Sequence, residues 1–304
     1  MILYFLLLIV IIALIFNKKS IEGFKQDKPF ENSKKCLLVY YGGSFREGTI
    51  GTTVSDTKYG YTAQKHASIT HAKLKRVLNE KGYQTDILVN TRHTEYKKDL
   101  INWYNPFNLI INNIPKNMHG KDYMIQSCIE NINKLNKEDY KFILFVRIDL
   151  FLKPEFYKII DTDSNKIMFL ANNYNPKNCN NFNKGRPEIV DLFMFIPQKY
   201  FYILDYKFKL NHDAWSYLKK KYNLLDTDFK FMSTLMFDSN SSIDKNPYYL
   251  MSSRSENKEL HNKYIYDEKN ISNKECKKYD NLYQKYLTYP TEYYLKKYNT
   301  FYNS

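Results

Sequence analysis

The sequence has few of the residues that build small or non-globular scaffolds. Its 304 residues include 9 glycines and 9 prolines, which excludes collagen-like chains and Pro/Gly-rich linkers. The cysteines are widely spaced and form no CxxC pair, which excludes a disulfide-dense scaffold and disfavours a zinc ribbon: Cys36, Cys128, Cys179 and Cys276. The motifs GxSxG, HExxH, GxxxxGK[ST] and GxGxxG are also absent, so the enzyme classes that depend on them are unsupported.

Acidic residues are few compared with basic ones. The chain has 32 Asp and Glu against 46 Lys and Arg, a formal net charge of +14. Its preference for Lys, Asn, Ile, Tyr and Phe over Ala, Gly, Pro and Arg is typical of an AT-rich genome, so part of this charge reflects codon bias. The lysines are scattered, and residues 219–221 form their longest run. We therefore expect a solvated basic surface and no nucleic-acid partner.

A long apolar run opens the sequence. Residues 1–16 read MILYFLLLIVIIALIF and are followed by Asn17, Lys18 and Lys19. As a helix the run spans roughly 24 Å, less than the ~30 Å hydrocarbon core, but local thinning and snorkelling lysines compensate. A cleaved signal peptide is the alternative, yet no basic segment precedes the run and no small-x-small cleavage site follows it. We predict a single-pass anchor at residues 1–17 and a polar stem at 18–35.

Two features of the sequence favour opposite sides of the membrane for the folded body. The lysines after the run favour a cytosolic body by the positive-inside rule. Two sequons, at Asn240 and Asn270, are usable only on the lumenal side, but two are expected by chance in so asparagine-rich a chain.

The folded body alternates strands and helices. Its 29 tyrosines and 20 phenylalanines supply ample surface to bury. Residues 36–41 are an apolar strand ended by Gly42 and Gly43, followed by a polar loop at 44–61, a helix at 62–81 and a strand at 83–89. Such β-loop-α-β units form parallel sheets that bind ligands beyond the carboxyl ends of their strands.

A second buried strand carries charges at its end. Residues 142–146 are five consecutive apolar residues, and Arg147 and Asp149 follow on one face. Buried strands avoid such charges unless they meet a ligand or each other, so both a binding site and a structural ion pair are open. Further along, the pattern predicts a short helix at 154–160, strands at 167–171 and 189–197, helical segments near 198–205 and 212–222, and a Tyr/Lys-rich helical extension at 257–304.

These residues together resemble a known family. The run YYGGSFR at residues 40–46, the helix with Gln64, Ser68 and His71, the Arg-Ile-Asp sequence at 147–149 and the strand with Asp191 resemble GT-A-type nucleotide-sugar-dependent glycosyltransferases. More narrowly, they resemble the divergent glycosyltransferase-like proteins of large DNA viruses and algae. The resemblance implies a Rossmann-like, three-layer α/β/α domain with a mainly parallel mixed sheet at residues 36–256. It also implies a host endomembrane or virion membrane as the location.

The resemblance implies a donor site at the strand ends. In this family the loop after the first strand holds the nucleotide, and a D-x-D motif binds a divalent metal on the diphosphate. Here the motif reads R-I-D, so Asp149 alone matches a metal ligand for Mn²⁺ or Mg²⁺, and Arg147 is the alternative source of positive charge. The candidate donor-binding residues are Tyr41, Gly42, Gly43, Ser44, Arg46, Gln64, Ser68, Arg147 and Arg254.

Glycosyl transfer also needs a group that takes the acceptor's proton. Asp191, within an apolar strand, is the first candidate, with a buried carboxylate satisfied by backbone donors as the structural alternative. His212 and Asp213 are the second candidates, although Asp213 also suits a helix N-terminal cap.

The sequence therefore predicts a membrane-anchored glycosyltransferase with a nucleotide-sugar donor and a glycan or protein acceptor. One alternative is a sulfotransferase-like group transferase, but the Gly42 loop lacks the lysine that such phosphate-binding loops carry. A second is an anchored structural or glycan-binding protein that has the fold without the chemistry, which the missing first acid of D-x-D favours. A basic nucleic-acid binder ranks third.

Overall fold

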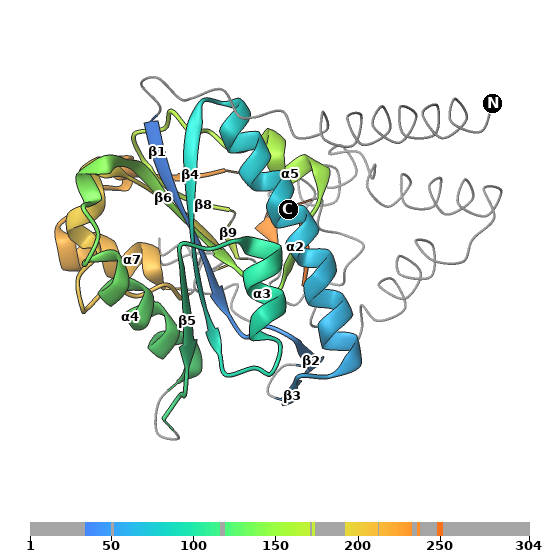
Figure 1. The fold of residues 1–304 in the computed structure, drawn as a ribbon. Coiled ribbons are helices and arrows are strands. Elements are labelled where there is room, and N and C mark those ends of the chain that lie inside the picture. The colour runs from blue at the N-terminus through green and yellow to red at the C-terminus, as the bar shows by residue number, and fades with distance from the viewer. Residues whose placement is uncertain are drawn as a thin grey trace, which may run out of the picture. The chain divides into compact units, whose positions relative to one another are not determined.

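The computed structural model describes residues 34–49, 52–115, 119–170, 172–173, 192–211, 213–232, 236–237 and 248–251 (Figure 1). The chain separates into two units, Met1–Ser33 and Lys34–Ser304, and the described residues all belong to the second. The predicted anchor at 1–17 and the predicted extension at 257–304 lie outside them. Within the described ranges, no helix combines the length and the apolar character that crossing a bilayer requires.

A seven-stranded mixed sheet forms the centre of the described unit. β1, β4, β5 and β6 run parallel, β10 runs antiparallel to both β6 and β8, and β11 runs parallel to β8. The strands lie in the order β11 (Phe229–Phe231), β8 (Ile167–Phe169), β10 (Phe193–Pro197), β6 (Tyr140–Arg147), β1 (Lys34–Gly42), β4 (Tyr83–Arg92) and β5 (Asn108–Asn112). The predicted mainly parallel mixed sheet is confirmed.

The central strand β1 divides the protein into two cores. It lies between β6 and β4, and its apolar run is fully buried because both faces of the sheet are covered. Alternate side chains enter opposite cores: Cys36, Leu38 and Tyr40 enter one, and Leu37, Val39 and Tyr41 enter the other.

Helices cover both faces of the sheet, which makes three layers (Figure 1). α2 (Lys58–Glu80) and α3 (Lys97–Tyr104) supply apolar residues to the core that contains Tyr40. α4 (Gly120–Ile132) and α7 (Ala214–Tyr222) supply them to the core that contains Tyr41. α2 begins after Thr57, whose hydroxyl accepts a hydrogen bond from the Gly60 N–H at 2.9 Å as a helix cap.

The structure corrects several predicted element types and boundaries. The segment predicted as a polar loop contains a hairpin of β2 (Arg46–Thr49) and β3 (Thr52–Ser55), because its threonines and valine suit paired strands better than a loop. The helix predicted near 198–205 is the 3₁₀ helix η3 (Gln198–Ile203). β4 continues to Arg92, three residues beyond the predicted end, since its polar last residues still pair with β1 and β5.

The remaining described elements are short. They are α5 (Pro154–Lys158), η1 (Lys137–Asp139), η4 (Asp226–Asp228), and the strand pairs β7 (Leu150–Leu152) with β13 (Tyr249–Met251) and β9 (Asn172–Asn173) with β12 (Met236–Phe237).

We expect Gly60→Ala to destabilise the protein. A Cβ at Gly60 would lie 2.2 Å from the Phe45 carbonyl oxygen, a backbone atom that cannot rotate away, so α2 and the loop after β1 must separate. Overpacking of this kind costs about 1–3 kcal/mol. Urea denaturation of the full-length protein measures the change. Lys65→Ala, at an exposed position of the same helix, is the control and should stay within about 0.5 kcal/mol of the wild type.

Candidate functional site

The candidate site lies where three neighbouring parallel strands end. Tyr41 of β1 pairs with Arg147 of β6, and Gly42 pairs with Thr91 of β4. The Ile148 N–H donates to the Tyr41 carbonyl at 2.8 Å, so β1 and β6 stay joined up to the point where their chains diverge. This is the edge of an open α/β sheet at which ligands bind.

Two glycines give the loop after β1 its path. Gly42 has φ = 120°, a conformation that favours glycine. At Gly43 a Cβ would lie 3.1 Å from Cδ of Arg46, so the missing side chain leaves the space through which Arg46 folds back over the loop. Phe45 then anchors the loop, with its ring 4.9 Å from that of Tyr96.

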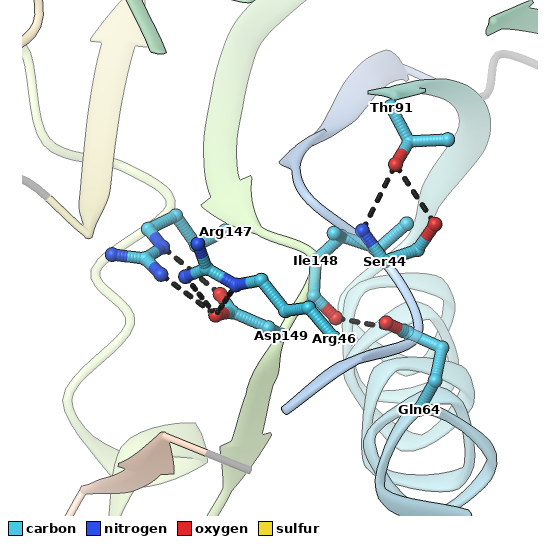
Figure 2. A network of polar contacts seen from close by, with 7 residues as sticks. All are labelled: Ser44, Arg46, Gln64, Thr91, Arg147, Ile148 and Asp149. Carbon is cyan, nitrogen blue, oxygen red and sulfur yellow. Dashed lines mark hydrogen bonds and ion pairs between the residues drawn. The ribbon is translucent and has the colours of Figure 1, made fainter. Parts of the chain in front are cut away.

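Arg46, Arg147 and Asp149 form one ion-pair network (Figure 2). Arg147 donates from Nε to Oδ1 of Asp149 at 2.9 Å and from Nη2 to Oδ2 at 2.7 Å, as a two-bond fork. Arg46 donates from Nε and Nη2 to the same Oδ2, at 3.1 and 2.5 Å. Both alternatives for Arg147 and Asp149 thus stand, because the ion pair exists and lies at a ligand-binding edge.

The network holds Asp149 ionised. Burial raises the pKa of the Asp149 carboxyl, but the charges and hydrogen bonds of Arg147 and Arg46 outweigh burial and place that pKa well below its usual range. Burial lowers the pKa of Arg46, Asp149 raises it, and the like charges of Arg147 and Arg92 lower it again. Asp149 is 2% exposed, whereas the two arginine side chains are 19% and 16% exposed and reach solvent.

This arrangement does not fit a divalent metal on Asp149. Three of the four N–H contacts go to Oδ2 and one to Oδ1, and the two guanidinium charges that make them adjoin the place that a cation would take and repel it. Among the described residues, no group of three or more His, Cys, Asp or Glu side chains is arranged to hold a metal ion. The geometry instead favours Arg147 as the source of positive charge.

Two other predicted donor-binding residues, Gln64 and Ser44, hold the backbone around the ion-pair network. Gln64 donates from Nε2 to the Ile148 carbonyl at 2.8 Å and so fixes the backbone next to Asp149 (Figure 2). The Ser44 N–H donates to the Thr91 hydroxyl at 3.0 Å, which ties the loop to β4.

Two further predicted residues lie inside the fold. Tyr41 is fully buried, and the Ser68 hydroxyl donates to the Lys65 carbonyl within α2 at 2.6 Å. Both positions indicate structural roles.

Of the predicted proton acceptors, only Asp213 lies within the described residues. Asp213 is exposed, and it precedes α7 without a capping hydrogen bond from its side chain. Asp191, His212 and Arg254 lie outside the described residues.

Arg92, the last residue of β4, is a charged residue at this edge that was not predicted from the sequence. Its charge lowers the pKa of Arg46, which places it among the groups that act on the network. The signal was present, because arginine is scarce in this chain and Arg92 follows a predicted strand. It was missed because the strand was predicted to end at Val89, three residues before Arg92.

Gln64 belongs to a buried cluster of polar side chains that also contains Tyr104 and His71. Nε2 of Gln64 also donates to the Tyr104 hydroxyl at 2.9 Å, and that hydroxyl lies 2.9 Å from Nδ1 of His71. The His71 ring stacks on Tyr40, 4.4 Å between centroids. Burial lowers the pKa of His71 to about 3, so the ring is neutral at pH 7.

We predict that His71 makes the fold sensitive to acid. Its pKa is lower in the folded protein than in the unfolded chain, so the unfolded state takes up the proton first and stability falls as the pH drops from about 6.5 towards 3. Between pH 7 and pH 5 the loss is roughly 2 kcal/mol. Urea midpoints at both pH values test this in the wild type and in His71→Gln. An equal pH dependence in the two proteins would contradict the prediction.

Asp149→Ala should destabilise the protein by about 3–5 kcal/mol, because it leaves two partly buried guanidiniums without their shared carboxylate. Asp122→Ala removes an exposed carboxylate on α4 and is the matched control. Urea denaturation at pH 7 measures both. A loss no larger than that of the control would show that the network contributes little to folding.

No protein-family model and no curated protein sequence matches this chain. Among solved structures it is similar to a glycosyltransferase involved in the glycosylation of the major capsid of PBCV-1, with 8% identity and a TM-score of 0.34 over 67% of this chain and 81% of that chain. It is also similar to HddC from Yersinia pseudotuberculosis, complexed with GMP-PN, with 13% identity and a TM-score of 0.42 over 76% of this chain and 99% of that chain.

A third similar structure is the galactosyltransferase LgtC in complex with donor and acceptor sugar analogues, with 9% identity and a TM-score of 0.34 over 63% of this chain and 66% of that chain. With TM-scores below 0.5, no residue role or activity passes from these proteins to this one. Solved structures similar to this chain thus include glycosyltransferases, and the resemblance that the sequence predicts is confirmed as a likeness.

Proposed function

We propose that this protein transfers a sugar from a nucleoside diphosphate donor to a hydroxyl of a glycan or protein. The observation that carries the proposal is the pair of guanidiniums held on Asp149 beyond the carboxyl ends of β1 and β6. The glycine turn beside them lets the Arg46 side chain fold back over the loop towards Asp149.

The chemistry requires positive charge at this position. In the transfer, the bond between the anomeric carbon and the diphosphate oxygen breaks, and the acceptor oxygen bonds to that carbon and loses its proton. The leaving diphosphate gains negative charge, which preorganised guanidiniums stabilise in the transition state. Arg46 and Arg147 are suited to this role, since each combines a fixed position with partial exposure to solvent.

Asp149 positions these two arginines. Its carboxylate fixes both guanidinium planes, so little side-chain entropy is lost when a phosphate binds the two arginines. Asp191 remains our first candidate for the group that takes the acceptor proton, and His212 and Asp213 remain the second. Membrane attachment through residues 1–17 is part of the proposal and rests on their apolar sequence alone.

A second function fits the same site. A protein that binds a phosphorylated ligand or a glycan without transferring it would need the arginines but no metal, and the Asp149 carboxylate is already paired with both arginines. Hydrolysis or transfer of a nucleotide sugar by the purified protein distinguishes the two functions.

We expect Arg147→Gln to weaken binding of a nucleoside diphosphate about tenfold or more, because it removes a charged fork from the phosphate site while Arg46 still pairs with Asp149. Calorimetric titration of the full-length protein with UDP and GDP measures this. Arg76→Gln, at an exposed position of α2, is the matched control and should bind as the wild type does. The proposed function is wrong if the wild type binds no nucleotide among UDP, GDP and CMP.

A further inference from the structure

Arg92 ends β4 at the same edge of the sheet as the ion-pair network. The preceding residue, Thr91, pairs with Gly42 and accepts the hydrogen bond from the Ser44 backbone, while Arg92 itself pairs with Asn112 of β5. It therefore lies directly beside the glycine turn, on the side opposite to β6.

Strand alternation places Arg92 and Arg147 on one face of the sheet. Arg92 comes four residues after Leu88, and Arg147 comes two residues after Phe145, so each arginine shares a face with that apolar residue. Leu88 and Phe145 both belong to the core beneath α4. The two side chains thus extend that face beyond the apolar core, from strands on either side of β1.

Within the described residues, the Arg92 side chain lies next to positive charge and has no anionic partner. Its Nη2 lies so close to Gly120, the first residue of α4, that a Cβ there would be 2.5 Å away, and the amino end of a helix carries partial positive charge. Its Nε is buried without a hydrogen-bond partner, and Arg92 forms no ion pair with any residue in the described ranges. Arg92 and Arg46 also repel each other, since the charge of Arg92 lowers the pKa of Arg46.

Asp149 does not neutralise this third cation. Its oxygens already accept four N–H contacts from Arg46 and Arg147. A multivalent anion bound between the strand ends and α4 would bring negative charge to Arg92. A divalent cation at the same place would repel the arginines.

We propose that Arg92, together with Arg46 and Arg147, holds the donor diphosphate without a divalent cation. The inference rests on the proposed function and adds both a phosphate-binding residue and independence from metal. Three guanidiniums from three chain segments offer forked donors to a diphosphate and take the place of the charge that a metal would bring.

The test measures binding of UDP, GDP and uridine to the full-length protein by calorimetry, in EDTA and then in excess Mg²⁺ or Mn²⁺. We expect UDP and GDP affinities to agree within about twofold between these conditions. Arg92→Gln should weaken diphosphate binding about tenfold or more and leave uridine binding unchanged, because uridine carries no phosphate. Arg76→Gln is the control and should match the wild type.

A variant that keeps the charge provides a second test. Gly120→Ala places a methyl group against the end of the Arg92 side chain, which moves at little cost to folding, so UDP affinity should fall while the urea midpoint is preserved. Binding that requires Mg²⁺ or Mn²⁺, or UDP affinity unchanged in Arg92→Gln, overturns this inference and leaves the proposed function intact. Absence of nucleotide binding under every condition overturns both.

Discussion

The site depends on one carboxylate that two guanidiniums share. Asp149 is almost completely buried, a position that an ionised side chain tolerates only when charged donors replace its water. Those donors come from chain segments about a hundred residues apart, Arg46 after β1 and Arg147 at the end of β6. The carboxylate therefore fixes the loop after β1 over the edge of the sheet, and the charged groups that adjoin solvent there are the arginines.

The contacts behind the carboxylate keep it in place. Nε2 of Gln64 donates to both the Ile148 carbonyl and the Tyr104 hydroxyl. That hydroxyl also contacts Nδ1 of His71, a buried residue of α2. The Gln64 amide, the Tyr104 hydroxyl and Nδ1 of His71 have partners in this chain, which helps to fix the backbone next to Asp149. Gln64, which the resemblance assigns to donor binding, thus acts by holding the backbone next to the charged groups.

Local sequence pattern predicted the long buried strands but not the strand ends or the short strands β2 and β3. The apolar runs of β1 and β6 were predicted because strands buried on both faces have a distinctive sequence. β4 was predicted too short, and Arg92 was lost with its last residues, because polar residues at a strand end do not differ from a loop until the neighbouring strands are known. The hairpin of β2 and β3 was missed because its strands have four residues each, too few to show a clear pattern before their pairing is known.

The sequence by itself determined the alternating α/β order, the glycine turn after the first strand, and the presence of Arg147 and Asp149 at a strand end. These follow from periodicity and from backbone preferences, which are local properties. Only the tertiary structure decided that Arg46 reaches Asp149, that two arginines share this carboxylate, and that Arg92 adjoins the same edge. Coulombic interactions depend on distance in space, and the parallel pairing of β6, β1 and β4 is what makes those distances short.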